Sequence, residues 1–308
     1  FDEVGLRGIL GRGFNTMKTM PWGSPSTSYE PVDSALADLA RLQRIVKPNP
    51  RLSIALAPGV NWSMSAEGVA ASVELQRQGM LVTLHLQENE LDDEYSLKMF
   101  GQRAVPFLAD AGLLGPTFLA VHAVQMPPED MALFIEHDVA VSHNPASNMI
   151  LGSGVAKVTE MLASGLRVGL ATDGAASNDS QNMIEAMKLA ALLQKGFLRD
   201  TSALGAQQTL EMATRIGASA VGMGDLTGSL EAGKRADFVL LDMDRPNTFP
   251  VADFAAALVY AGEPGNVDSV AVDGEFIFDR GAFTRVDQGV LLRQAWEKMG
   301  QIEKTLNQ

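Results

Sequence analysis

The sequence predicts an α/β protein of the (β/α)8-barrel type, with about six β/α units present and a few short β-strands outside the barrel at the C-terminal end. Three observations lead to this prediction. Short apolar runs alternate with longer stretches of helical periodicity, and each connection between two runs includes a helix. The runs are almost wholly apolar, as in a parallel sheet buried on both faces. A closed barrel of this kind has eight units, so two are missing from the count.

The predicted elements follow in a regular order over the first two thirds of the chain. The strands are Leu6–Leu10, Leu52–Leu56, Leu81–His85, Phe118–His122, Val139–His143 and Val168–Thr172. The helices are Val32–Val46, Ala66–Arg77, Met99–Ala111, Glu129–His137, Val155–Ala163 and Ser180–Lys195. A loop rich in Pro, Ser and Thr, Lys18–Tyr29, follows the first strand at the face where barrel enzymes place their active sites.

The pattern changes after about Gln208. Two short helices are expected there, and the Asp273-Gly274 pair predicts the turn of a β-hairpin. The expected elements are helices Thr209–Ile216 and Ala218–Met223, strands Phe238–Leu241, Val267–Val272 and Glu275–Asp279, and a final amphipathic helix Leu291–Leu306. The sequence therefore predicts a barrel over residues 1–225, and a segment of short β-strands with a terminal helix over residues 226–308.

Composition excludes several kinds of partner. A net charge of −13 argues against nucleic acid or an anionic membrane. There are no cysteines, so a bound metal would need His, Asp or Glu ligands. No apolar run approaches the roughly 20 residues that cross a bilayer, and the start of the chain has no basic signal region. We expect a cytoplasmic protein that binds a small molecule.

The segment His85-Leu86-Gln87-Glu88 predicts a metal-dependent hydrolytic site. A histidine at a strand end can ligate a cation, and a carboxylate three residues later can carry protons to and from a metal-bound water. Three of the four histidines, His85, His122 and His143, end predicted strands, at the face where barrels place their active sites. The alternatives are core histidines bonded to backbone carbonyls, and for Glu88 a solvated loop carboxylate.

Asp173 follows the last predicted barrel strand and is a second candidate ligand. At that position an aspartate can bind a cation and accept a hydrogen bond from an attacking water. The alternative is an aspartate that caps the helix expected to begin near Ser180.

Five segments, taken in order and spacing, resemble the amidohydrolase superfamily, in the branch of S-adenosylhomocysteine/methylthioadenosine deaminases and triazine chlorohydrolases. They are His85-Leu86-Gln87-Glu88, Val121-His122-Ala123-Val124, Ser142-His143-Asn144-Pro145-Ala146-Ser147-Asn148, Leu151-Gly152-Ser153-Gly154-Val155-Ala156 and Ala171-Thr172-Asp173-Gly174-Ala175-Ala176-Ser177-Asn178. The segment Gly228–Asp242 is similar to the one with which these proteins return to their second, β-sandwich domain. The resemblance thus implies a metal-dependent hydrolase barrel, strands three to eight, over residues 1–225 and part of a β-sandwich with a terminal helix over residues 226–308.

The resemblance implies roles for individual residues. His85 and Asp173 match metal ligands, with zinc expected and iron as the alternative. Glu88 matches the general acid/base, and His122 a histidine that hydrogen-bonds the attacking or carbonyl oxygen. The resemblance also places Ser177 and Asn178 on a loop that borders the substrate, and His143 in the strand-seven turn. Such barrels often dimerise, so a homodimer is a further expectation.

Two departures concern completeness. The family's first strand carries a His-x-His pair of ligands, and this sequence has no such pair. By the resemblance, Phe1 falls just before barrel strand three, so we expect a partial chain that lacks strands one and two. A metal held by one histidine and one aspartate is under-ligated. As a separate polypeptide, the chain should bind metal poorly and be inactive.

Other departures concern the substrate. Arg12, at the end of the first strand, matches an arginine that holds the amino-acid tail of the substrate, but a second arginine expected in Lys18–Tyr29 is absent. Trp22, Tyr29 and Trp62 lie in loops that would face a flat heteroaromatic ring, with ordinary loop packing as the alternative.

The expected reaction is hydrolytic deamination of an amino-substituted purine, pterin or triazine ring. A chlorohydrolase of triazine-like rings and a non-catalytic barrel that has lost its metal site are the alternatives. Enzymes that expel chloride often lack this glutamate, so Glu88 favours loss of an amine.

Overall fold

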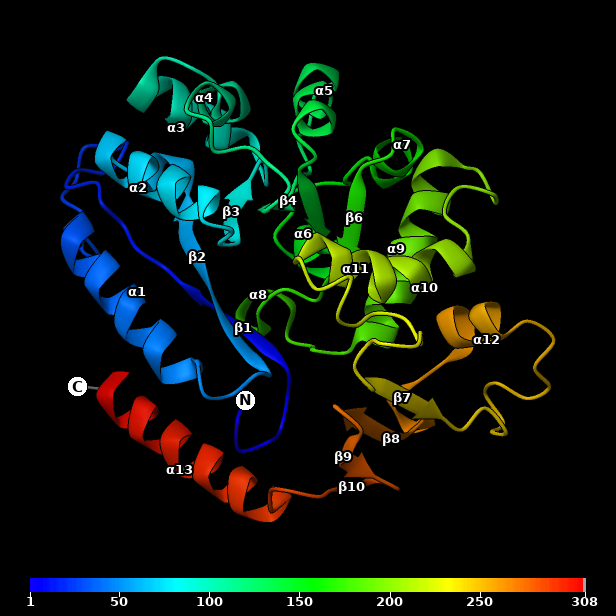
Figure 1. The fold of residues 1–308 in the computed structure, drawn as a ribbon. Coiled ribbons are helices and arrows are strands. Elements are labelled where there is room, and N and C mark those ends of the chain that lie inside the picture. The colour runs from blue at the N-terminus through cyan, green and yellow to red at the C-terminus, as the bar shows by residue number, and fades with distance from the viewer. Residues whose placement is uncertain (307–308) are drawn as a thin grey trace.

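Six parallel strands form the larger of two sheets in the structure, a computed structural model that describes residues 1–306 (Figure 1). The strands lie in chain order, and only β1 and β6 have an open edge. Their bounds are β1 Gly8–Arg12, β2 Leu52–Val60, β3 Val82–Leu86, β4 Phe118–His122, β5 Ala140–His143 and β6 Arg167–Leu170. The predicted fold class, a parallel β/α sheet followed by a small antiparallel sheet, is confirmed.

Helices connect the strands and cover the sheet (Figure 1). Side chains such as Val82, Leu86 and Phe118 are fully buried between the layers, which explains why the strands read as apolar runs. The helices are α1 Val32–Val46, α2 Ala66–Arg77, α3 Glu90–Phe100, α4 Ala104–Asp110, α5 Pro128–Glu136, α6 Pro145–Ile150, α7 Val158–Ala163, α8 Ala175–Asn178, α9 Met183–Leu198, α10 Ala206–Ala213 and α11 Arg215–Ala220, with a 3₁₀ turn η1 at Asn61–Ser63.

The helix predicted over Met99–Ala111 is wrong, because two helices occupy this region. The first, α3, begins after Asn89, whose side chain accepts a hydrogen bond from the Leu91 N–H. Its first turn holds Glu90, Asp92 and Asp93, where negative charge favours the helix dipole. It ends at Gly101, which adopts a left-handed conformation, φ 74°, and separates α3 from α4.

The end of the last barrel strand also differs from the prediction. Strand β6 stops at Leu170, so Thr172 and Asp173 lie in the following loop. Helix α9 begins at Met183, and Asn182 caps it by accepting a hydrogen bond from the Ile184 N–H. Asp173 therefore does not cap this helix. At the other edge, β1 starts two residues later than predicted, which makes Arg12 its last residue.

The second sheet is antiparallel and has four strands in the order β10-β9-β8-β7. The predicted hairpin is present, and both Asp273 and Gly274 have positive φ, 52° and 77°, as a two-residue I′ turn requires. The elements are β7 Phe238–Leu241, α12 Phe254–Ala261, the 3₁₀ turn η2 Pro264–Asn266, β8 Val267–Val272, β9 Glu275–Asp279 and β10 Ala282–Phe283. Sequence reasoning missed α12, and also α6 and α8. The boundary predicted at residue 225 lies between α11 and β7.

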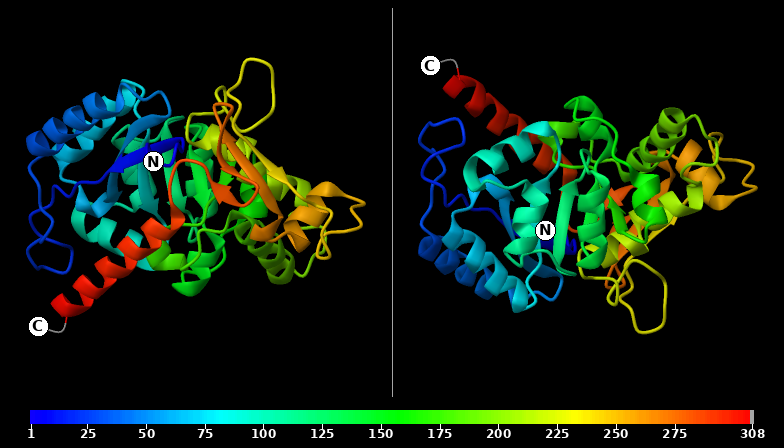
Figure 2. Two further views of the ribbon diagram at one scale, coloured as in Figure 1. Left: turned by 90° about the horizontal axis from the view of Figure 1, so that it is seen from below. Right: turned by 90° about the horizontal axis from the view of Figure 1, so that it is seen from above.

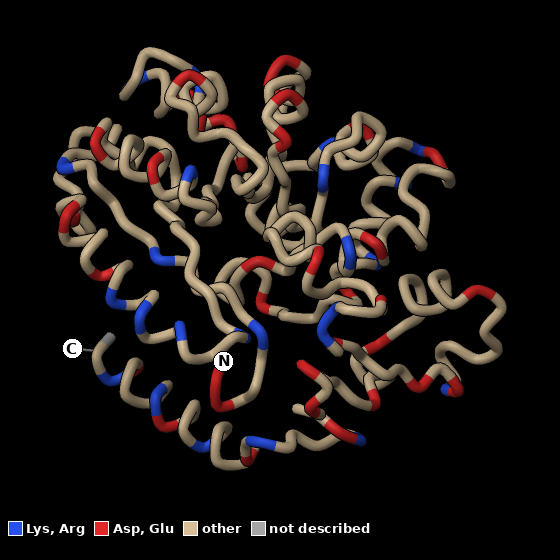
Figure 3. The backbone as a smooth tube through the Cα atoms, in the orientation of Figure 1, with Lys and Arg blue, Asp and Glu red and all other residues tan. Residues whose placement is uncertain are grey.

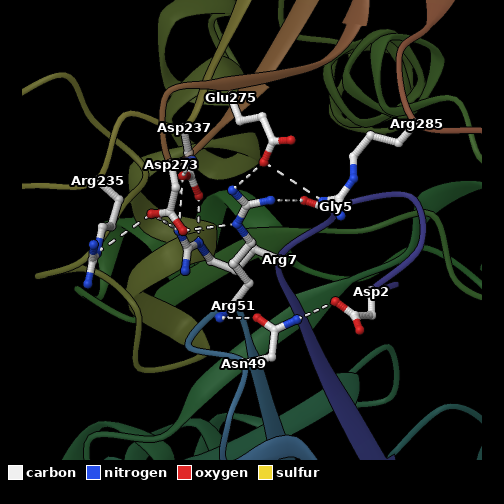
Figure 4. Close-up of polar contacts among 10 residues, drawn as sticks. All are labelled: Asp2, Gly5, Arg7, Asn49, Arg51, Arg235, Asp237, Asp273, Glu275 and Arg285. Carbon is white, nitrogen blue, oxygen red and sulfur yellow. Dashed lines mark hydrogen bonds and ion pairs between the residues drawn. The ribbon is translucent and has the colours of Figure 1, made fainter.

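Ion pairs fasten the second sheet to the amino-terminal ends of β1 and β2 (Figure 4). Arg7 contacts Asp237 at 2.6 Å and Asp273 at 2.8 Å. Arg51 contacts Asp273 at 3.1 Å and Glu275 at 2.9 Å. Burial opposes ionisation of Asp237, but hydrogen bonds from Arg7 and from the Asp273 N–H hold its pKa below the ordinary value. The two sheets are thus joined by partly buried charges.

The terminal helix α13, Gln288–Leu306, extends away from the body of the molecule (Figure 2). It starts three residues before the predicted helix, and its apolar side chains Leu292 and Trp296 are 63% and 73% exposed. Acidic and basic positions are interspersed along it (Figure 3). Among residues 1–306, no helix combines the length and the apolar composition that crossing a bilayer requires.

Candidate active site

The carboxyl ends of neighbouring strands place three predicted site residues together. His85 lies on β3 and His122 ends β4, and the register pairs Leu86 with His122. The two imidazole rings stack with centroids 5.4 Å apart and an interplanar angle of 27°. Glu88 follows β3 directly, and its Oε2 lies 3.7 Å from Nε2 of His122. A carboxylate and two imidazoles therefore lie together at the carboxyl ends of β3 and β4.

Two hydrogen bonds hold Glu88. Its backbone N–H donates to Oδ2 of Asp92 at 2.8 Å, and Ser153 Oγ donates to its Oε1 at 3.4 Å. Burial raises the pKa of Asp92. The side chain of Glu88 remains 19% exposed, so it can reach a bound molecule. These contacts leave Oε2 directed at His122.

His122 is almost completely buried, and two asparagines set its orientation. Oδ1 of Asn148 lies 2.8 Å from Nδ1, and the Asn144 side chain lies 3.4 Å from the same atom. The Asn148 carbonyl accepts from Nδ1–H, so the proton sits on Nδ1, and Nε2 faces Glu88 as an acceptor. Sequence reasoning missed both asparagines, although they belong to the Asn-Pro-Ala-Ser-Asn run after β5.

His85 is exposed, and its Nδ1 lies 3.0 Å from the backbone oxygen of Gly59. A carbonyl accepts from an N–H, so this contact places the proton on Nδ1 and leaves Nε2 with a free electron pair. Metal-binding histidines are commonly oriented by such a bond from the other ring nitrogen. Gly59 lies at a bulge in β2 with φ 88°, and this conformation turns its carbonyl toward His85.

His143 ends β5 and is fully enclosed. Burial, with a smaller contribution from nearby His122, lowers its pKa to about 4. In the described structure neither ring nitrogen has a hydrogen-bond partner. At neutral pH the ring is therefore uncharged.

Asp173, Ser177 and Asn178 lie on the loop and short helix after β6. The Asp173 carboxylate accepts from the Gly174 N–H at 2.7 Å, and Asn178 donates to the Thr172 carbonyl at 2.6 Å. Within the described residues, no hydrogen bond or ion pair joins Asp173 to Glu88 or His122. The loop thus supplies a carboxylate at the sheet edge, apart from the Glu88–His122 pair.

The donors for a metal form an incomplete set. His85 Nε2 and the Asp173 carboxylate have suitable chemistry, but residues 1–306 contain no group of three or more His, Asp or Glu side chains placed to hold a metal. Zinc sites in enzymes use three protein ligands and a water. The described residues therefore do not make a complete metal site by themselves.

Unusual backbone conformations occur at three site positions: Gln87, His122 and Asp173 have φ of 54°, 78° and 64°. Such angles cost free energy in residues other than glycine and persist only where surrounding contacts impose them. For Gln87 those contacts are its backbone oxygen, which accepts from Val124 and Gln125 N–H groups at 2.9 Å, and its side-chain amide, which donates to Asp130.

Asp130, which accepts the hydrogen bond from the Gln87 side chain, is buried. It is fully enclosed and accepts from both Nη atoms of Arg103, at 2.8 and 2.7 Å. Burial raises its pKa, and the hydrogen bond from Arg103 opposes this effect. The segment between His85 and Glu88 is thereby fixed to α5. Sequence reasoning missed Gln87 and Asp130, because only the folded chain brings them together.

A pocket of about 450 Å³ opens beside His85, at the ends of β1 and β2. Gly59, which binds His85, forms part of its wall, as do Arg12 and Trp62. Trp62 Nε1 lies 3.5 Å from the Asp92 carboxylate, which in turn binds the Glu88 backbone. Asp92 therefore links the pocket, through Trp62, to the backbone of Glu88.

The predicted substrate residues Trp62 and Arg12 differ in their surroundings. Trp62 packs in a cluster with Trp22 and Tyr95, at ring distances of 5.9 and 5.4 Å. Tyr95 was missed, and Tyr29 lies outside the cluster, beneath the Lys18 ammonium at 5.5 Å. Arg12 forms ion pairs with the carboxylates of Glu30 and Asp38.

A larger hollow of about 960 Å³ lies elsewhere, between α9, α10, α12 and β7. Its wall is mostly apolar, with Met183, Leu210 and Phe254 among its residues, and includes none of the predicted site residues. Catalysis of a hydrolysis needs titratable groups that are free to act at the reacting atoms, and the one acidic side chain of this wall, Asp237, is bound by Arg7. We therefore place the site at the smaller pocket.

A family model for the amidohydrolase family matches residues 2–277, nearly the whole sheet-and-helix region described above. The chain belongs to the amidohydrolase family. This amidohydrolase is 37% identical over 294 residues to a protein of Nitratidesulfovibrio vulgaris named 5-methylthioadenosine/S-adenosylhomocysteine deaminase. A protein of the same name from Desulforudis audaxviator is 37% identical over 300 residues. These alignments cover 95% and 96% of the chain.

Two solved structures that are similar to this amidohydrolase contain bound zinc. An adenosine deaminase from Xanthomonas campestris with bound zinc superposes with a TM-score of 0.91 at 29% identity, over 98% of this chain and 68% of the other. Atrazine chlorohydrolase from Arthrobacter aurescens TC1, complexed with zinc, superposes with a TM-score of 0.88 at 27% identity, over 95% and 66%. The chain spans 65% and 66% of the length of the two deaminase-named relatives.

Proposed function

We propose that the complete protein is a hydrolytic deaminase that removes the amino group from a heteroaromatic ring, with an adenosine-type purine as the first candidate. The observation that carries the proposal is the Glu88 carboxylate 3.7 Å from the Nδ1-anchored His122, beside His85. The names of the two deaminase relatives support the choice of ring.

In the proposed reaction, the oxygen of a water molecule bonds to the ring carbon that carries the amino group, and the bond from carbon to nitrogen breaks. Glu88 takes the proton from the attacking water and gives it to the departing nitrogen, which leaves as ammonia. Nε2 of His122 accepts a hydrogen bond from the other O–H of the attacking water, because Asn148 accepts from Nδ1–H and leaves Nε2 as the acceptor nitrogen. Asp173 is the second proposed proton acceptor.

We also propose His85 and Asp173 as two ligands of a divalent metal, zinc first and iron second. The free Nε2 of His85 and the zinc in two structural neighbours support this assignment. A bound divalent metal would supply a lowered pKa for water. Because the donor set of the described residues is incomplete, the remaining ligands have to come from outside it.

The substrate would lie between the Glu88–His122 pair and the pocket that Arg12 and Trp62 line. We propose Ser177 and Asn178 as residues at its border and neutral His143 as the wall behind His122. A purine has the flat shape that the tryptophan cluster can contact, and pterin and triazine rings share this shape. No role for nucleic acid or membrane is proposed. A homodimer and a cytoplasmic location stay predictions.

Glu88→Gln in the complete protein tests the proposal. Turnover of adenosine-type substrates should fall by about 10²- to 10⁴-fold, the usual contribution of a general acid/base, while metal content measured by atomic absorption persists. Glu90→Gln, an exposed position in the first turn of α3, is the matched control and should keep full activity. Turnover retained in Glu88→Gln would remove this residue from the mechanism.

A chlorohydrolase is the second candidate, supported by the likeness to atrazine chlorohydrolase. Chloride leaves without a proton, whereas ammonia needs one, and Glu88 is placed to supply it. Chloride release from chlorotriazines without ammonia release from aminopurines would favour this candidate. A barrel without catalysis, the remaining alternative, predicts neither product from the complete protein loaded with zinc.

A further inference from the structure

The charge of Arg12 is already neutralised inside the pocket wall. Its Nη2 donates to both oxygens of Glu30 at 2.9 Å, its Nε donates to Asp38 at 2.8 Å, and its Nη1 donates to the Gly13 carbonyl. The arginine side chain is only 18% exposed, and Glu30 is 24% exposed. The same contacts raise the pKa of Arg12 against the effect of burial, so it stays a cation held by two anions.

The other polar side chains of the pocket are satisfied as well. Asn15 donates to Ser26 and Ser28 at 3.0 and 3.2 Å, and its oxygen accepts from the Met17 N–H at 3.0 Å. Ser63 donates to the carbonyls of Pro58 and Val60 at 2.8 and 2.7 Å. Among the described residues, no polar side chain of this wall is left without a partner. The remaining surface is apolar, from Phe14, Met20 and Trp62.

We propose that this pocket accepts an uncharged, apolar substituent of the substrate, and that Glu30 is the residue that excludes a charged amino-acid tail. The proposal rests on the deaminase function proposed above. The reacting ring has to lie at Glu88 and His122, and the pocket adjoins them through Gly59 and Trp62. The part of the substrate remote from the reacting carbon therefore enters it.

The two substrates in the relatives' name differ in this part. 5-Methylthioadenosine ends in a methylthio group, whereas S-adenosylhomocysteine ends in an ammonium and a carboxylate. The carboxylate would find the donors of Arg12 occupied and would meet the negative charge of Glu30. The ammonium would find that Glu30 already accepts from Arg12, and from Ser34 at 3.1 Å. The carboxylate would lose water without gaining a partner, and the ammonium would reach only the one acceptor site that Arg12 and Ser34 leave on Glu30. The tail would therefore lose more hydrogen bonds to water than it gains, which is costly. A methylthio group is uncharged and apolar, so it gives up no strong hydrogen bonds to water when it enters the pocket.

The test measures kcat/KM of the complete zinc-loaded protein for both nucleosides by ammonia release. The unaltered protein should prefer 5-methylthioadenosine by about a hundredfold, and Glu30→Gln should raise the value for S-adenosylhomocysteine by about tenfold or more, the discrimination that one charge-assisted hydrogen bond can give. The gain should come from a lower KM for S-adenosylhomocysteine. Equal kcat/KM values in the unaltered protein, or no change in Glu30→Gln, would overturn the proposal.

Asp38→Asn is the matched control, because it removes the other carboxylate on Arg12 but lies outside the pocket wall. It should leave the preference unchanged, and an equal gain in this variant would show that Glu30 is not the determinant. Calorimetry on Glu88→Gln separates the two proposals. Binding of neither nucleoside contradicts the deaminase function, whereas equal binding of both contradicts only the role of Glu30. Melting curves verify that each variant is folded.

Discussion

His143 is completely buried, and neither of its ring nitrogens has a hydrogen-bond partner among residues 1–306, a rare state for a histidine in a folded protein. Its neighbour His122 differs, because Asn148 accepts from one of its nitrogens. A neutral His143 avoids a second positive charge beside His122 and keeps the buried end of the site uncharged at neutral pH.

We expect the titration of His143 to reduce stability in acid. Its pKa is about 4 in the folded protein against an ordinary value near 6.5, so the unfolded chain binds more protons between these pH values. Its contribution is complete above pH 6.5 and falls by about 3 kcal/mol as the pH drops to about 4. Denaturant unfolding of His143→Leu at several pH values should show a flatter acid decline than the unaltered protein. Parallel declines would contradict the burial of this ring.

Single residues were predicted with uneven success. His85, Glu88 and His122 could be found from the sequence, because each follows or ends an apolar run, and the structure brings them together. Asn148 and Asp92 hold those groups, yet they carry no signal of their own, since asparagine and aspartate are common in turns and helix ends. Arg12 was found, but its two anionic partners were not.

Among the elements, strands were easier to predict than helices. Strands β4, β7, β8 and β9 and helices α1 and α2 have the predicted bounds. The error at α3 and α4 arose because the acidic residues at the start of α3 were interpreted as a loop. Negative charges in the first turn of a helix interact favourably with the helix dipole, so these residues in fact favour a helix. Helix α12 was missed because nearly every residue in it is apolar, so it lacks the period that identifies a surface helix.

Two glycines should respond oppositely to alanine. Gly101 ends α3 in a left-handed conformation, so Gly101→Ala should destabilise the protein by about 1 kcal/mol, although the space beside it is open. Gly196 lies inside α9 with open space around it and no positive φ. Gly196→Ala should stabilise by about 0.5–1 kcal/mol. Thermal unfolding of both variants measures the two shifts, and a loss in Gly196→Ala would contradict the helix assignment.

At the scale of the whole molecule, the contact between the two sheets depends on charge. Arg7→Gln leaves Asp237 and Asp273 without their shared cation, and we expect a loss of about 2 kcal/mol because the pair is mostly buried. Arg280→Gln, which removes an arginine that is 81% exposed, is the control and should cost less than about 0.5 kcal/mol. Equal losses would show that the ion pairs do not join the sheets.

The ion pair between Arg7 and Asp237, which joins the two sheets, should weaken in acid. The pKa of Asp237 is lowered in the folded protein, so its stabilisation is complete above the ordinary aspartate value near 4 and is lost as the pH falls through the lowered value. The free energy of unfolding should therefore decline below about pH 4 in the unaltered protein and decline less in Arg7→Gln. Chemical unfolding at pH 5 and pH 3 compares them.

Metal binding provides another test at this scale. The polypeptide of residues 1–308 should bind zinc weakly, because its described donors fall short of the three protein ligands of a catalytic site. Titration against a competing chelator measures the affinity, with His85→Ala as the comparison. Tight binding of one zinc that His85→Ala abolishes would contradict the incomplete donor set.

The sequence by itself determined the order of β/α units, the acidic surface, the absence of thiol ligands, and the histidines and carboxylates at strand ends. These properties follow from local periodicity and composition. Only the tertiary structure decided that Asn148 orients His122, that Gln87 is fixed to Asp130, and that Glu30 neutralises Arg12. Such pairs join residues 18 to 43 positions apart, and no local pattern records a contact that exists only once the strands are in register.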